Sequence, residues 1–202
     1  MIVQHIDQIY KQHHQMNLNF VCRLCLACLL VTEAESLSCP DKSNSEKWGQ
    51  VKLYGDALTV SYATVTSSDE RSVLCARLES ELESYIGFGV SPLGRMLGGE
   101  AIIGRPDDGT VMKYNLIGSP RGVSLMENSN QTLMDEQITQ IDGRTIMTFT
   151  KYMQEEGEHE ILETGENVFL FAIGKSNTLD RKHWASGVFR VDFGLPGRFC
   201  MC

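Results

Sequence analysis

Apolar and polar residues alternate in short runs along most of the chain after Trp48. In the run LTVSYATV, for example, Leu58, Val60 and Tyr62 alternate with threonine and serine. The runs are rich in β-branched and aromatic residues and are bounded by Gly, Asp, Asn or Pro, a pattern typical of β-strands. Further runs of this kind cover residues 71–79, 85–90, 100–104, 110–118, 136–142, 144–153, 167–174 and 187–193.

The spacing of these runs predicts an all-β protein. Asp142-Gly143 stands between two alternating runs, which predicts a tight hairpin. After residue 40 no stretch shows a convincing helical period. We therefore expect roughly nine to eleven short strands that form an antiparallel sandwich or barrel.

The N-terminal region differs from this body. The mostly apolar segment Phe20–Val31 is too short to cross a bilayer but fits the apolar part of a secretory signal, with small residues such as Ala34 and Ser36 after it. We therefore expect a secreted protein, or one on the extracellular face of a membrane, with no transmembrane span in the mature chain. The expected parts are a leader over 1–38, a linker over 39–47, one domain over 48–194 and a tail over 195–202.

Cysteine usage agrees with secretion. The C-x-x-C-x-x-C motif over 22–28 lies in the leader, and an iron–sulfur site would need a cysteine where Thr32 stands. A disulfide from Cys39 to the C-terminal pair would tie the two ends of the domain together, and Asn130 begins an N-glycosylation sequon. The remaining cysteines allow two disulfides in any of three connectivities: Cys39, Cys75, Cys200 and Cys202.

Charge narrows the range of partners. The chain of 202 residues has a formal net charge of −8 and no basic run or basic–aromatic stripe. This argues against nucleic acids and anionic membrane surfaces as partners.

The segment 86–104 is rich in glycine and carries Met96 near its centre. A dinucleotide-binding loop needs a third glycine where Pro92 stands, and a serine-hydrolase elbow needs a glycine where Leu93 stands. Glycines on both sides of Met96 instead let a large rigid group approach the backbone closely.

Outside the leader only His159 and His183 are available as imidazole ligands. A copper monooxygenase or a multi-histidine zinc centre needs more of them. His159 lies in the acidic stretch EEGEHEILETGE, which we interpret as a solvated connection, and His183 directly precedes the last strand. No catalytic constellation emerges, so we do not expect an enzyme.

The order of these features resembles the DOMON family, named for the N-terminal domain of dopamine β-monooxygenase. The resemblance runs from Trp48 to Phe193, and the chain departs from it at Tyr85, where many members carry tryptophan. It rests on the stretches YIGFGVSPLGRM, GGEAIIG, DGTVMKYNLIG, DGRTIMTFTKYM, ENVFLFAIG and HWASGVFRVDF.

The resemblance implies an immunoglobulin-like β-sandwich and a cofactor. In cytochrome-type members, such as the haem domain of cellobiose dehydrogenase, a loop methionine and a late histidine bind haem iron from opposite sides. The matching residues here are Met96 and His183. Non-covalent haem b is implied, because the body has no C-x-x-C-H motif. Such a module passes single electrons to or from a redox partner protein or a small-molecule reductant.

Two alternatives stay open. DOMON domains outside the cytochrome branch imply a haem-free module that binds a sugar or similar ligand. The third possibility is an interaction domain without a ligand.

Overall fold

The computed structural model describes residues 39–40, 48–118, 122–180, 182–194 and 199–200, the last two as backbone only. The chain divides into two units, Met1–Ser36 and Leu37–Cys202, and every described residue belongs to the second. The predicted leader, Cys202 and the side chain of Cys200 lie outside the described residues. Within the described part, no helix is long and apolar enough to cross a membrane.

The described residues form twelve β-strands and one short 3-10 helix, η2 (Asn128–Asn130). The strands are β1 (Gly49–Leu53), β2 (Leu58–Thr66), β3 (Ser72–Ser80), β4 (Ile86–Val90), β5 (Glu100–Arg105), β6 (Thr110–Leu116), β7 (Val123–Leu125), β8 (Met134–Ile141), β9 (Arg144–Tyr152), β10 (Glu166–Ile173), β11 (Ala185–Asp192) and β12 (Phe199–Cys200).

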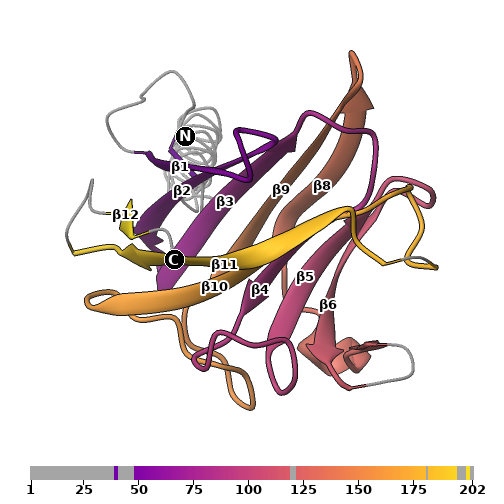
Figure 1. Ribbon diagram of the computed structural model, residues 1–202. Coiled ribbons are helices and arrows are strands. Elements are labelled where there is room, and N and C mark those ends of the chain that lie inside the picture. The colour runs from indigo at the N-terminus through magenta and orange to yellow at the C-terminus, as the bar shows by residue number, and fades with distance from the viewer. Residues whose placement is uncertain (1–38, 41–47, 119–121, 181, 195–198, 201–202) are drawn as a thin grey trace, which may run out of the picture. The chain divides into compact units, whose positions relative to one another are not determined.

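The strands form two antiparallel sheets that pack face to face (Figure 1). A five-stranded sheet has the order β1-β2-β3-β9-β8, and a seven-stranded sheet has the order β12-β11-β10-β4-β5-β6-β7. The predicted all-β sandwich is confirmed. The sequence pattern did not single out β1, β7 or β12, and the latter two are too short to show a pattern, with three and two residues.

Phenylalanines join the two sheets. Phe88 on β4 lies 5.5 Å, between ring centroids, from Phe149 of the other sheet. Within its own sheet its ring lies 4.9 Å from Phe169 on β10. Complete burial of a side chain of this size contributes about 1.5–3 kcal/mol. This packing fixes β4 as a central strand with one face toward the core.

The predicted hairpin is confirmed. Ile141 pairs with Arg144 across the turn between β8 and β9. Asp142 and Gly143 have φ angles of 52° and 80°. Positive φ at both central residues is the requirement of a type I′ turn, which Asp-Gly meets at little steric cost.

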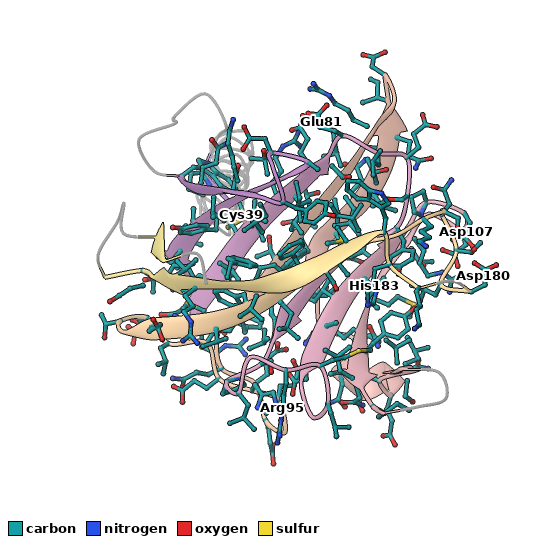
Figure 2. All side chains as sticks on the ribbon, viewed as in Figure 1. Cys39, Glu81, Arg95, Asp107, Asp180 and His183 are labelled. Carbon is teal, nitrogen blue, oxygen red and sulfur yellow. A yellow bond between two sulfur atoms is a disulfide. The ribbon has the colours of Figure 1, made fainter. Side chains whose placement is uncertain are left out.

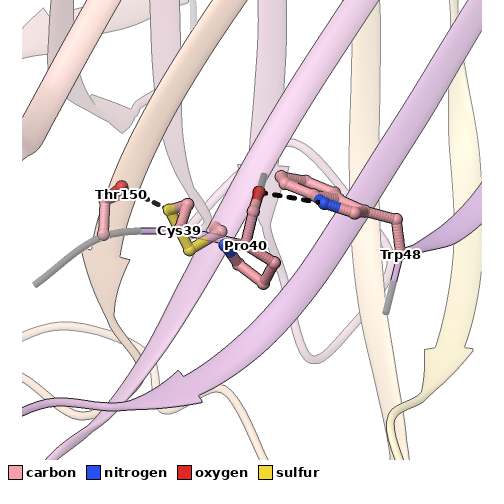
Figure 3. The surroundings of a disulfide bond; sticks show 5 residues. Cys39, Pro40, Trp48 and Thr150 are labelled. Atoms are coloured by element: carbon pink, nitrogen blue, oxygen red, sulfur yellow. Dashed lines mark hydrogen bonds between the residues drawn. A yellow bond between two sulfur atoms is a disulfide. The ribbon is translucent and has the colours of Figure 1, made fainter. Parts of the chain in front are cut away.

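One disulfide joins Cys39 to Cys75 on β3, 36 positions apart in the sequence. Thr150 donates a hydrogen bond of 3.1 Å to the Cys39 sulfur, and the Trp48 indole donates to the carbonyl of Pro40 (Figure 3). The expected bridge from Cys39 to the C-terminal pair is therefore wrong, because Cys39 is already bonded to the centre of the five-stranded sheet.

A buried ion cluster lies on the strands β6 and β9. The amino groups of Lys113 and Lys151 contact both Glu155 and Glu158, and the side chains of both lysines are only 2% exposed. The Lys113 amino group lies 2.8 Å from each of the two carboxylates. Two positive and two negative charges thus neutralise one another away from water. The interpretation of this acidic stretch as a solvated connection is wrong for these two glutamates.

The ion cluster generates a stability prediction. Lys151→Met leaves an uncompensated carboxylate in a buried site, so we expect a loss of about 3–5 kcal/mol in the free energy of unfolding. Lys52→Met is the matched control, because Lys52 forms an exposed pair with Asp56 and its loss should cost less than about 1 kcal/mol. Urea unfolding of both variants measures the difference. Equal losses would show that the cluster is not buried as described.

Candidate functional site

The outer face of the seven-stranded sheet carries the glycines of β4. Because Ile86, Phe88 and Val90 point into the core, Gly87 and Gly89 occupy the opposite face. A Cβ at Gly89 would lie only 3.0 Å from the Leu170 Cβ and from a backbone carbonyl. The centre of this face therefore has to stay free of side chains on β4.

Apolar residues surround these glycines. We call them the outer-face cluster; Leu170 on β10 and Met112 on β6 pack against its buried members. Together with the buried glycines they form a second apolar cluster, outside the core between the sheets. The buried members are Tyr85, Ala101, Ile103, Tyr114 and Leu116.

Met96 lies in the loop that follows β4. Its side chain is 39% exposed, and its terminal methyl lies 2.9 Å from the position that a Cβ on Gly122 would take. The same loop contacts the outer face, because Gly94 lies near Val168 and Val188 of β10 and β11. A partly exposed thioether therefore stands at this end of the sheet, rather than in the core.

His183 lies at the other end, directly before β11. Its Nδ1 atom lies 3.2 Å from the hydroxyl of Tyr85, which precedes β4. Burial is the main cause that lowers the pKa of His183, and the charge of Lys182 adds to it. The imidazole is therefore neutral at physiological pH, which is the form that binds metals.

The two predicted ligands thus reach one apolar face from opposite ends of β4. That strand has five residues, so the Cα atoms of its two end residues are about 13 Å apart at ~3.3 Å per residue. Figure 2 shows Arg95, the neighbour of Met96, well apart from His183. The structure places Met96 against Gly122 and His183 against Tyr85.

The donor types at this face fit haem, because a thioether and a neutral imidazole are the donors that bind haem iron in electron-transfer cytochromes. The structure does not bring these two donors together, since Met96 lies against Gly122 and His183 against Tyr85 at the other end of β4. A Cβ at Gly89 would crowd Leu170 and a backbone carbonyl, so the glycine lets β10 pack closely against β4. Among the described residues, no group of three or more His, Cys, Asp or Glu could hold a metal ion.

His159 connects the Met96 loop to the interior. Its Nε2 lies 2.7 Å from the carbonyl oxygen of Gly98, and its backbone N–H donates to Glu100 at the start of β5. The second carboxylate oxygen of Glu100 has no hydrogen-bond partner, and Glu100 lines a small cavity together with Lys113 and Lys151. Glu100 is therefore a buried acid beside an ion cluster that is already neutral.

The pKa of Glu100 is raised above 4.5, chiefly by burial and further by the charge of Glu158. The hydrogen bond from His159 and the charge of Lys151 act in the opposite direction but do not cancel it. The folded environment thus favours the protonated form more than water does. Sequence reasoning missed Glu100, because only the fold shows that its side chain is buried and lines the cavity.

The fold has a known counterpart. It is similar to the crystal structure of the cytochrome b domain of pyranose dehydrogenase from Coprinopsis cinerea, with a TM-score of 0.51 and 13% sequence identity. The match covers 72% of this chain and 81% of that chain. No protein-family model and no curated protein sequence matches. The predicted resemblance to cytochrome-type DOMON domains is confirmed at the level of the fold.

Sequence reasoning also missed the role of Tyr85. It was recognisable only as a departure from the tryptophan that many DOMON members carry. Its hydroxyl reaches His183 across 98 positions of sequence, a contact that the pairing of β10 with β4 and β11 creates. This contact could have been predicted only from knowledge of the strand order.

Glu100 generates a pH prediction. Because its folded pKa lies above 4.5, its contribution to stability is fully present below pH 4.5 and is lost as pH rises through the folded pKa. Glu100→Gln cannot ionise, so the variant should gain stability relative to the wild type as pH rises from about 5 to 8. Denaturant unfolding at several pH values measures this difference.

The control for Glu100→Gln is Glu83→Gln, which removes an exposed carboxylate. We expect its stability difference from the wild type to stay constant over the same range. A constant difference for Glu100→Gln as well would contradict the assignment of Glu100 as a buried acid.

Proposed function

We propose that this protein is a secreted b-type cytochrome domain that binds haem through Met96 and His183 and transfers single electrons. The observation that carries the proposal is that a thioether and a neutral imidazole stand at opposite ends of one glycine-centred apolar face. The likeness of the fold to a cytochrome b domain supports it.

Each part of the face has a chemical role in this proposal. Met96 and His183 would hold the haem iron through a thioether and an imidazole, and a thioether favours the reduced state. Gly87 and Gly89 keep β4 free of side chains on this face, and the outer-face cluster would exclude water from the bound group. Bound haem b would supply one reversible redox centre.

The Cys39–Cys75 disulfide supports an extracellular location, because such bonds persist in oxidising compartments. Secretion through the leader over 1–38 and glycosylation at Asn130 belong to the same proposal. Asn130 is the last residue of η2 and is partly exposed. The electron partner is a redox protein or a small-molecule reductant.

Haem titration tests the proposal. The full chain, produced in an oxidising host, should take up one equivalent of haem and give a low-spin Soret band with a sharp α band on reduction. Met96→Leu keeps the volume but removes the sulfur, and His183→Ala removes the imidazole. Both should shift the spectrum toward high spin, and we expect haem affinity to fall by more than about 100-fold, since loss of a ligand exceeds the usual effect of losing its supporting partner.

Two control variants sharpen this test. Leu93→Ala changes an exposed residue of the Met96 loop, 72% exposed, without altering a donor atom. His159→Ala removes the other imidazole of the described domain. Neither should convert the spectrum to high spin. A wild-type protein that stays colourless with equimolar haem would overturn the cytochrome assignment in favour of a haem-free binding or interaction module.

A further inference from the structure

We propose that Tyr85 is a positioning residue that holds His183 by Nδ1 and so leaves Nε2 as the nitrogen available to iron. The inference rests on the proposed function and deepens it. It starts from the 3.2 Å contact between the Tyr85 hydroxyl and Nδ1 of His183.

Tyr85 is itself held rigidly. Its backbone N–H donates to the carbonyl of Ser176 at 2.9 Å, and its own carbonyl accepts from Gly174 at 2.8 Å. Its side chain is only 4% exposed and lies against Gly174, where an added Cβ would clash with the ring. The hydroxyl is therefore a fixed point at the end of β4.

The segment that carries His183 is held from its other side. The backbone N–H of Trp184 donates to the carbonyl of Ile173 at 2.7 Å, which continues the pairing of β10 with β11 up to the histidine. His183 is thus fixed by its backbone neighbour and by one ring nitrogen. An imidazole held at two such points keeps its orientation whether or not a ligand is bound.

The contact is compatible with the tautomer that iron binding through Nε2 requires. A nitrogen that binds a metal uses its lone pair, so binding through Nε2 requires the proton to sit on Nδ1. A phenol oxygen can accept a hydrogen bond from Nδ1–H, and it can equally donate when the proton is elsewhere. Acceptance raises the basicity of the coordinating nitrogen, as partners of metal-bound histidines commonly do. Tyr85 therefore affects both haem affinity and reduction potential.

Tyr85→Phe tests the proposal, because it removes only the hydroxyl and keeps the ring against Gly174. In the full chain we expect haem affinity to fall by about 10–100-fold, the usual effect of losing such a partner. The reduction potential should rise, since a less basic imidazole stabilises the oxidised metal less. In the reduced diamagnetic protein, the Nδ1 proton of His183 should exchange with solvent faster, as measured by proton NMR.

Tyr62→Phe is the matched control. Tyr62 is a buried tyrosine, 9% exposed, on β2 of the five-stranded sheet, away from the outer-face cluster. It should leave affinity, potential and proton exchange unchanged. Thermal unfolding of both variants shows that each still folds.

The outcomes separate the two proposals. If wild type and Tyr85→Phe bind haem with equal affinity, potential and proton exchange, the positioning role is wrong and the cytochrome assignment stands. If Tyr62→Phe changes these properties as much as Tyr85→Phe does, the effect belongs to packing and the positioning role is wrong. If the wild type takes up no haem, the proposed function fails and the inference fails with it.

Discussion

The period of two along β4 is the constraint on which the site depends. Phe88 and its neighbours Ile86 and Val90 enter the core between the sheets, so Gly87 and Gly89 must lie on the other face. A slip of one residue in the register with β5 or β10 would bring phenylalanine to the outer face and glycine into the core. The ring contacts of Phe88 with Phe149 and Phe169 hold that register. The alternation of large residues and glycines along β4 therefore accounts both for the core packing and for the absence of β4 side chains on the outer face.

The connections at the two ends of β4 then determine which side chains lie at the edges of this face. The connection before β4 carries Tyr85, and the strand order places the residues before β11 beside it. The loop after β4 carries Met96 and leans on β10 and β11 through Gly94. Residues 87 positions apart (183 − 96) thus lie at the two ends of a single strand. This spatial relation comes from the strand order and cannot be read from the sequence around Met96 or around His183 alone.

Local patterns were sufficient for the strands and the hairpin, because alternation and the Asp142-Gly143 turn act over a few residues. Long-range pairings were not predictable in the same way. Lys113 and Glu155 are 42 positions apart, and only the packing of the acidic connection onto β6 turns a charged stretch into a buried cluster. The partner of Cys39 was likewise open among three connectivities until the register of β3 was known. Met96 and His183 were found from a family resemblance, whereas Tyr85 and Glu100 needed coordinates.

Gly174 has a consequence for how this site can change over evolution. The position accepts no side chain while the Tyr85 ring lies against it, and its N–H also bonds to the Tyr85 carbonyl. A smaller residue at position 85 would make room for a side chain at position 174. A larger residue at position 174 is therefore tolerated only after position 85 has become smaller. Positions 85 and 174 are therefore expected to change together among relatives. The contact between residue 85 and His183 would then be kept or lost together with the glycine at position 174.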